Sequence, residues 1–180
     1  MQSKFLILLL FWVPSLYAED KKLARDGVEL FVSARTVEQI RAFYGARGMP
    51  ADALQELAKA CFLTVGLKNK RAETLWLEPL RWRLIDVDGK PINLISRQEW
   101  KSRWKALSVP LAAQSTFGWS QLPESRDLYP EETVGGNISL LPPEGSFSLI
   151  ASFRTGSSGD GKMLELIIPN LSCSRLGENP

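Results

Sequence analysis

The fold of this chain is decided by residues 133–169, which read TVGGNISLLPPEGSFSLIASFRTGSSGDGKMLELIIP. The stretch contains three runs with the composition of β-strands: Thr133–Leu141, Ser146–Thr155 and Lys162–Pro169. The links between them, residues 142–145 and 156–161, are rich in Pro, Gly and Ser. Short strands at this spacing, joined by turn-forming residues, predict an antiparallel β-sandwich.

Two segments further upstream have the same two-residue period. In residues 28–34, every second side chain is apolar. In residues 61–67, Cys61 and every second residue after it form one apolar face of a strand, and Phe62 and Thr64 lie on the other face. Residues 73–87, ETLWLEPLRWRLIDV, predict one or two more strands that end at an Asp-Gly turn. Residues 19–26 are charged, and we expect them to be frayed. The chain is therefore predicted to be mainly β.

Two segments have helical signals instead. Thr36 and Gln39 form a capping box, and apolar side chains at helical spacing predict a helical hairpin over residues 36–60. Ser96 and Glu99 form a second box before a helix at residues 97–107. The long excursion at residues 108–128 has no clear period, and we expect at most a short edge strand around Phe117 to Trp119.

The N-terminal residues 1–18, MQSKFLILLLFWVPSLYA, have the layout of a secretory signal peptide. Lys4 precedes an apolar run that is too short to span a membrane, and small residues lead to a predicted cut after Ala18. An uncleaved anchor is the alternative. We expect a periplasmic or secreted protein, with residues 19–180 as one sandwich domain carrying helical insertions at about 36–60 and 97–107. No later segment is apolar enough to be a transmembrane helix.

The chain has two cysteines, Cys61 and Cys173. An even number of cysteines in a secreted protein favours pairing, so we predict a Cys61–Cys173 disulfide. Two buried free thiols are the alternative. The spacing excludes the Cys-x-x-Cys motif of thioredoxin-like oxidoreductases.

Composition excludes several kinds of chemistry. The chain has no histidine, which removes Ser–His–Asp and Cys–His catalysis and the common histidine-based metal sites. The formal net charge is only +2, which argues against nucleic-acid binding. No catalytic, cofactor-binding or metal-ligating residue is predicted.

The C-terminal part resembles the immunoglobulin-like β-sandwich domains of bacterial extracytoplasmic proteins. The resemblance rests on the segment from Leu128 to Gly136, LYPEETVGG, and on the later Phe147-x-Leu149 and Phe153-Arg154. It implies an immunoglobulin-like sandwich, an architecture that hosts binding, scaffolding and adhesive functions. Fold resemblance alone assigns none of these functions.

The tryptophans are the candidate contact residues. Trp100 and Trp104 form a stripe with Leu107 on the predicted helix, which either docks on the sheet or contacts a membrane or partner. Trp119 lies in a polar stretch and is the best candidate for an exposed aromatic side chain. The alternative for all of the tryptophans is burial in the core.

These observations favour a non-enzymatic interaction or accessory module that acts through a cell-envelope protein partner. The helical hairpin and the excursion at residues 108–128 are the expected partner surfaces, because a plain sandwich needs neither. The first alternative is a protein that binds carbohydrate or a small ligand through exposed aromatics. A hydrolase built on carboxylates is the second alternative.

Overall fold

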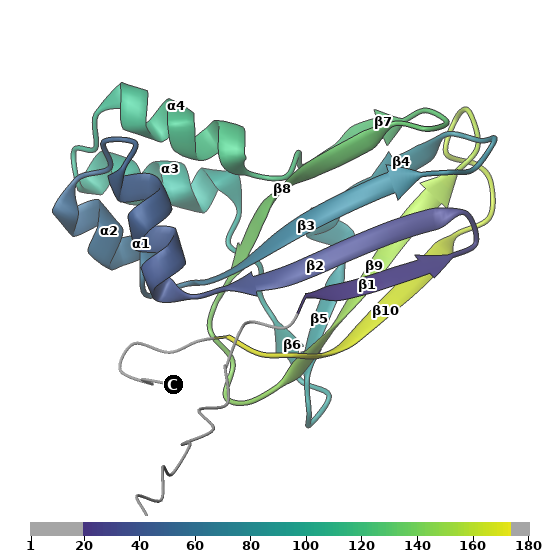
Figure 1. The fold of residues 1–180 in the computed structure, drawn as a ribbon, viewed down its shortest axis with the longest axis horizontal. Helices are drawn as coiled ribbons and strands as arrows, with labels where there is room; N and C mark the ends of the chain where they lie inside the picture. The colour runs from purple at the N-terminus through teal and green to yellow at the C-terminus, as the bar shows by residue number, and fades with distance from the viewer. Residues whose placement is uncertain (1–19, 174–180) are drawn as a thin grey trace, which may run out of the picture.

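The computed structural model describes residues 20–173 of the chain. The predicted signal peptide and its cut after Ala18 lie outside the described residues. Within them, strands predominate, and two antiparallel sheets pack face to face while four α-helices gather at one end (Figure 1). The expectation of a mainly β fold with antiparallel sheets is confirmed.

The first sheet has four strands in the order β1-β2-β3-β8. Their bounds are Lys21–Arg25, Val28–Arg35, Cys61–Asn69 and Thr133–Leu140. The charged segment near the N-terminus thus forms a strand that the sequence did not predict. It turns back on β2 through Asp26 and Gly27, which both have positive φ (52° and 74°). Glycine adopts this conformation without steric cost, which allows the tight turn.

The second sheet has six strands, and the long strand β9 lies at its centre. It pairs with β10 on one side and with β4 and β5 on the other, while β7 and β6 extend the sheet. The bounds are Leu75–Leu77 for β4, Arg83–Asp86 for β5, Pro91–Ile92 for β6, Arg126–Leu128 for β7, Phe147–Thr155 for β9 and Leu164–Leu171 for β10. The ETLWLEPLRWRLIDV segment therefore forms two strands, with a 3₁₀ turn at Pro79–Arg81 between them.

The main core lies between the two sheets. Alternate side chains of β2, β3, β9 and β10 fill it, as the two-residue period predicts. At the edge of this core, Cys61 at the start of β3 forms a disulfide with Cys173, just after β10. The Cα atoms are 5.6 Å apart and the bond closes a sequence separation of 112 residues. The predicted disulfide is confirmed, and it ties the first sheet to the second.

The helices form a second core at the end of the sandwich. The hairpin consists of α1 (Val37–Gly45) and α2 (Ala51–Leu57), and the later pair consists of α3 (Arg97–Ala106) and α4 (Leu111–Ser120). Both predicted capping boxes are present, at Thr36 and at Ser96. Within residues 20–173, none of the helices is long and apolar enough to cross a membrane.

Helix α4 replaces the short edge strand expected around Phe117 to Trp119, and that prediction is wrong. Ala113 and Phe117 lie one helical turn apart, and both are buried in the second core. Packing against α3 therefore selects the helix, although Gly118 and the neighbouring Ser and Thr residues have weak helix propensity. The excursion also contains β7, which pairs with β4.

Gly136 of β8 allows the segment after α4 to approach the first sheet closely. Gln121 forms a parallel bridge with Asn137, and Leu122 N–H donates to the Asn137 carbonyl at 2.9 Å. A Cβ atom on Gly136 would lie 2.7 Å from the Gln121 carbonyl carbon. This glycine is needed because a side chain would push the end of α4 away from the sheet.

We therefore expect Gly136→Ala to lower the free energy of unfolding by about 2 kcal/mol, because backbone atoms at this contact must move apart. Gly135→Ala is the matched control on the same strand. Its added Cβ would lie 3.4 Å from the Val65 carbonyl oxygen, and we expect a change below about 1 kcal/mol. Urea unfolding measures both variants, and equal losses would contradict the close-approach argument.

Candidate functional site

Two of the three candidate contact tryptophans belong to the second core. The rings of Trp100 and Trp104 stack with centroids 4.9 Å apart, and each residue is 1% exposed. Trp100 also donates its indole N–H to Ser139 Oγ at 2.7 Å. The tryptophan stripe thus docks α3 onto the sandwich, and neither residue offers a face to a membrane or a protein partner.

Trp119 is the exception among the tryptophans of residues 20–173. Trp82 is 5% exposed and Trp76 is half-buried, whereas Trp119 at the end of α4 is 90% exposed. Exposed apolar side chains lie on both sides of it: Phe43 of α1 shares one hollow with it, and Leu111 of α4 shares another. We call Phe43, Leu111 and Trp119 the Trp119 surface. It joins the hairpin to the excursion, the two segments that the sequence singled out.

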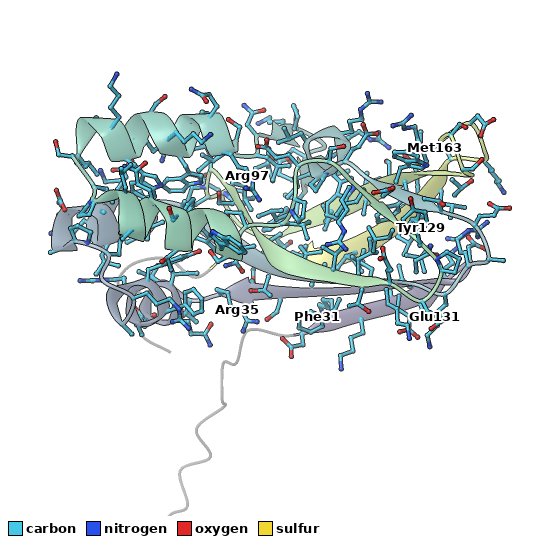
Figure 2. The ribbon with its side chains drawn as sticks, turned by 90° about the horizontal axis from the view of Figure 1, so that it is seen from above. Phe31, Arg35, Arg97, Tyr129, Glu131 and Met163 are labelled. Atoms are coloured by element: carbon cyan, nitrogen blue, oxygen red, sulfur yellow. A yellow bond between two sulfur atoms is a disulfide. The ribbon has the colours of Figure 1, made fainter. Side chains whose placement is uncertain are left out.

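A cleft of about 540 Å³ lies on one side of Trp119, where α1 and α4 meet strands β3 and β8. We call it the Arg35 cleft, and Figure 2 labels Arg35 at the end of β2 near the helices. Arg35 Nε donates to Thr64 Oγ1 at 2.8 Å, and Thr64 Oγ1 donates to Asn137 Oδ1 at 2.7 Å. The cleft therefore combines ordered polar side chains with the exposed rings of Phe43 and Trp119.

The Tyr44 hydroxyl is the centre of the hydrogen-bond network beneath this cleft. It lies 2.7 Å from Ser120 Oγ, and it accepts from Gln121 Nε2 at 3.0 Å and from Asn137 Nδ2 at 3.4 Å. Burial raises the pKa of Tyr44 above its usual value of 10.0, while hydrogen bonds to these neighbours oppose the rise. The network holds the end of α4, and with it Trp119, against α1 and β8.

A second groove, of about 660 Å³, lies on the other side of Trp119, between α3 and α4. We call it the α3–α4 groove. Its ionisable lining residues are all basic, namely Arg97, Lys101 and Arg126. No Asp or Glu lines this groove, the Arg35 cleft or the hollow shared by Phe43 and Trp119. Within residues 20–173, no cluster of three His, Cys, Asp or Glu side chains could hold a metal ion.

The sequence did not predict that Arg35, Phe43, Arg97 and Asn137 lie near Trp119. Each lies on a different element, and only the packing of those elements brings them near Trp119. Phe43 recurs at helical spacing together with the buried residues Ile40 and Tyr44, yet it is 39% exposed. Helical spacing alone does not predict which side chain of an apolar stripe is exposed to solvent.

The tyrosine network gives a prediction for Tyr44→Phe. At neutral pH, we expect it to lower the free energy of unfolding by about 1–2 kcal/mol, because Ser120, Gln121 and Asn137 each lose a partner. The raised pKa means that the folded state holds the phenolic proton more tightly than the unfolded state does. The stabilisation of the folded state by the protonated Tyr44 hydroxyl is therefore complete below the ordinary pKa of tyrosine, and it is lost as the pH rises above that pKa.

The gap in stability between the wild type and Tyr44→Phe should therefore stay constant up to about pH 9 and narrow as the pH rises above about 10. Urea unfolding across this pH range measures the gap. Tyr129 also has a raised pKa, but it is present in both proteins and cancels in the comparison. A constant gap would show that the pKa of Tyr44 is not shifted by folding.

Comparison with known proteins finds a weak structural similarity and no family. No protein-family model matches the sequence, and a search of curated proteins found no match. Among solved structures, the crystal structure of the yjhA protein from Bacillus subtilis aligns over 83% of this chain and 96% of that one. Its identity is 11% and its TM-score is 0.49, so it is similar only in outline.

Proposed function

We propose that this protein is a non-enzymatic interaction module that binds a cell-envelope protein partner through the Trp119 surface. The observation that carries the proposal is the 90% exposure of Trp119 between two other exposed apolar side chains. Tryptophan is among the residues that contribute most to protein–protein affinity, and burying one indole removes a large apolar area from water. In the isolated protein the Trp119 indole stays in solvent, so the protein lacks the stabilisation that burial of this ring would give.

The support of the surface makes it suited to docking. Trp119 precedes Ser120 and Gln121, whose side chains bond to Tyr44, so the backbone that carries the indole is fixed. Arg47 lies over the Phe43 ring, with its guanidinium carbon 3.7 Å from the ring centroid. A surface that is ordered before binding loses less conformational entropy when the partner arrives.

We also propose a periplasmic or secreted location and an immunoglobulin-like arrangement of the sandwich. The disulfide supports the location, because such bonds persist in oxidising compartments. Strand β8 at the edge of the first sheet is followed by the antiparallel hairpin β9–β10 in the second sheet, with turns at Gly145 and at Gly156 to Gly161, and this crossing between two packed sheets supports the arrangement. Neither proposal is needed for binding at the Trp119 surface.

Capture from the native cell envelope tests the protein partner. A tagged copy is crosslinked mildly and its partners are identified by mass spectrometry, in parallel for wild type, Trp119→Ala and Met163→Ala. Met163 is also exposed, and Figure 2 shows it at the end of the molecule away from Arg97 and the helices. We expect one near-stoichiometric partner that Trp119→Ala reduces at least about tenfold and Met163→Ala leaves unchanged. A partner retained by both variants would contradict docking at Trp119.

Carbohydrate binding is the second candidate, and the Arg35 cleft favours it. The cleft places the guanidinium of Arg35 and the amide of Asn137 beside exposed aromatic rings. Such sites use a few fixed polar groups for orientation and apolar surface for affinity. Soluble cell-wall glycan fragments should then change the tryptophan fluorescence of the wild type but not that of Trp119→Phe. A flat titration of the wild type would count against this function.

A further inference from the structure

We propose that the α3–α4 groove binds a small organic anion, a carboxylate or phosphate ester with an apolar body. This proposal concerns a different face of Trp119 from the Arg35 cleft, and it does not depend on a protein partner. It begins from unpaired polar atoms. Three buried side-chain nitrogens have no hydrogen-bond partner in the described part of the chain, and two of them, Arg97 Nε and Trp104 Nε1, belong to residues that line this groove.

The unpaired indole is the stronger of the two observations. Trp104 is 1% exposed, so its N–H has lost its water without gaining a protein acceptor. A buried donor without a partner costs about 1–3 kcal/mol, and most folded proteins avoid it. The neighbouring Trp100 is equally buried, but its indole N–H donates to Ser139 Oγ. An acceptor atom on a ligand would remove the cost at Trp104.

The charge of the groove selects an anion. Arg97 donates through Nη2 to the carbonyls of Gln121 and Leu122, at 3.2 and 3.3 Å, which fixes the guanidinium, and it forms no salt bridge among the residues that the structure describes. Lys101 lies one helical turn away and forms no salt bridge with any residue from 20 to 173. Arg126 also lines the groove, although Glu132 lies 3.9 Å from it. The Glu124 carboxylate accepts from the Arg97 backbone N–H at 3.0 Å and is not part of the groove lining.

The rest of the lining selects an apolar body. Leu111 and Trp119 contribute exposed apolar surface, and the buried rings of Trp100 and Phe117 lie behind it. Gln114 and Ser115 complete the wall that α4 forms. The volume of about 660 Å³ lies in the usual range for small-molecule sites. Basic residues at the rim of an aromatic wall fit an amphipathic anion better than they fit an inorganic ion or a neutral lipid.

A set of four probes tests the proposal with the folded protein: decanoate, decyl phosphate, decanol and inorganic phosphate. Binding is measured by calorimetry and by NMR of the tryptophan indole N–H groups. The Trp104 resonance is identified by its loss in Trp104→Phe. We expect this resonance to shift on addition of decanoate or decyl phosphate, and the stronger of the two identifies the headgroup. Decanol and inorganic phosphate should bind at least about tenfold more weakly.

Lys101→Gln is the main variant, because Lys101 is exposed and its replacement leaves the core intact. Lys105→Gln is the matched control, since it makes the same change on the same helix at a residue that does not line the groove. We expect Lys101→Gln to weaken binding of the tighter anion about three- to tenfold and Lys105→Gln to leave it unchanged. Equal effects of the two variants, equal binding of decanol, or an unmoved Trp104 resonance at saturation would each overturn the proposal.

Discussion

The structure depends on the two buried faces at the start of strand β3. Cys61 points into the sandwich and bonds to Cys173, whereas Phe62, the next residue, points to the helices and stacks on Trp100 with centroids 5.9 Å apart. Phe62 is 1% exposed, and burial of such a ring contributes about 1.5–3 kcal/mol. Because side chains alternate along a strand, a slip of one residue would exchange these two positions. It would break the disulfide and empty the helical core together, so both cores fix the same register.

The local signals in the sequence were sufficient for most of the elements. The period of two at Cys61 to Leu67 and the capping boxes at Thr36 and Ser96 correspond to strand β3 and to helices α1 and α3. Such signals work because each depends on neighbours a few residues away. The sequence does not predict strand β1, because its side chains are mostly charged and the strand is stabilised by backbone pairing with β2. Helix α4 was missed because its stability comes from Ala113 and Phe117 packing on another helix rather than from its own composition.

The candidate site was predicted only in part, for a related reason. The exposure of Trp119 was anticipated from its polar surroundings in the chain. The grooves on either side of it were not, because their walls come from residues far apart in sequence, such as Arg97 and Arg126 or Arg35 and Asn137. Helix α4 has two roles in this arrangement. Its buried face completes the helical core, and its last turn presents the indole at a point held by the Tyr44 hydrogen bonds.

The disulfide also determines how the molecule would respond to mechanical tension. If the chain were pulled at residues 20 and 173, the load at the C-terminal end would pass through the sulfur atoms directly to Cys61. The 112-residue interval that the bond closes would then bear no force along its own backbone. Only the segment before Cys61, which holds β1, β2, α1 and α2, could extend, to a length of roughly 140 Å at full stretch for about 40 residues. Extension of that segment would remove Phe43 from the Trp119 surface and Tyr44 from the end of α4, whereas every residue that lines the α3–α4 groove lies within the unloaded interval.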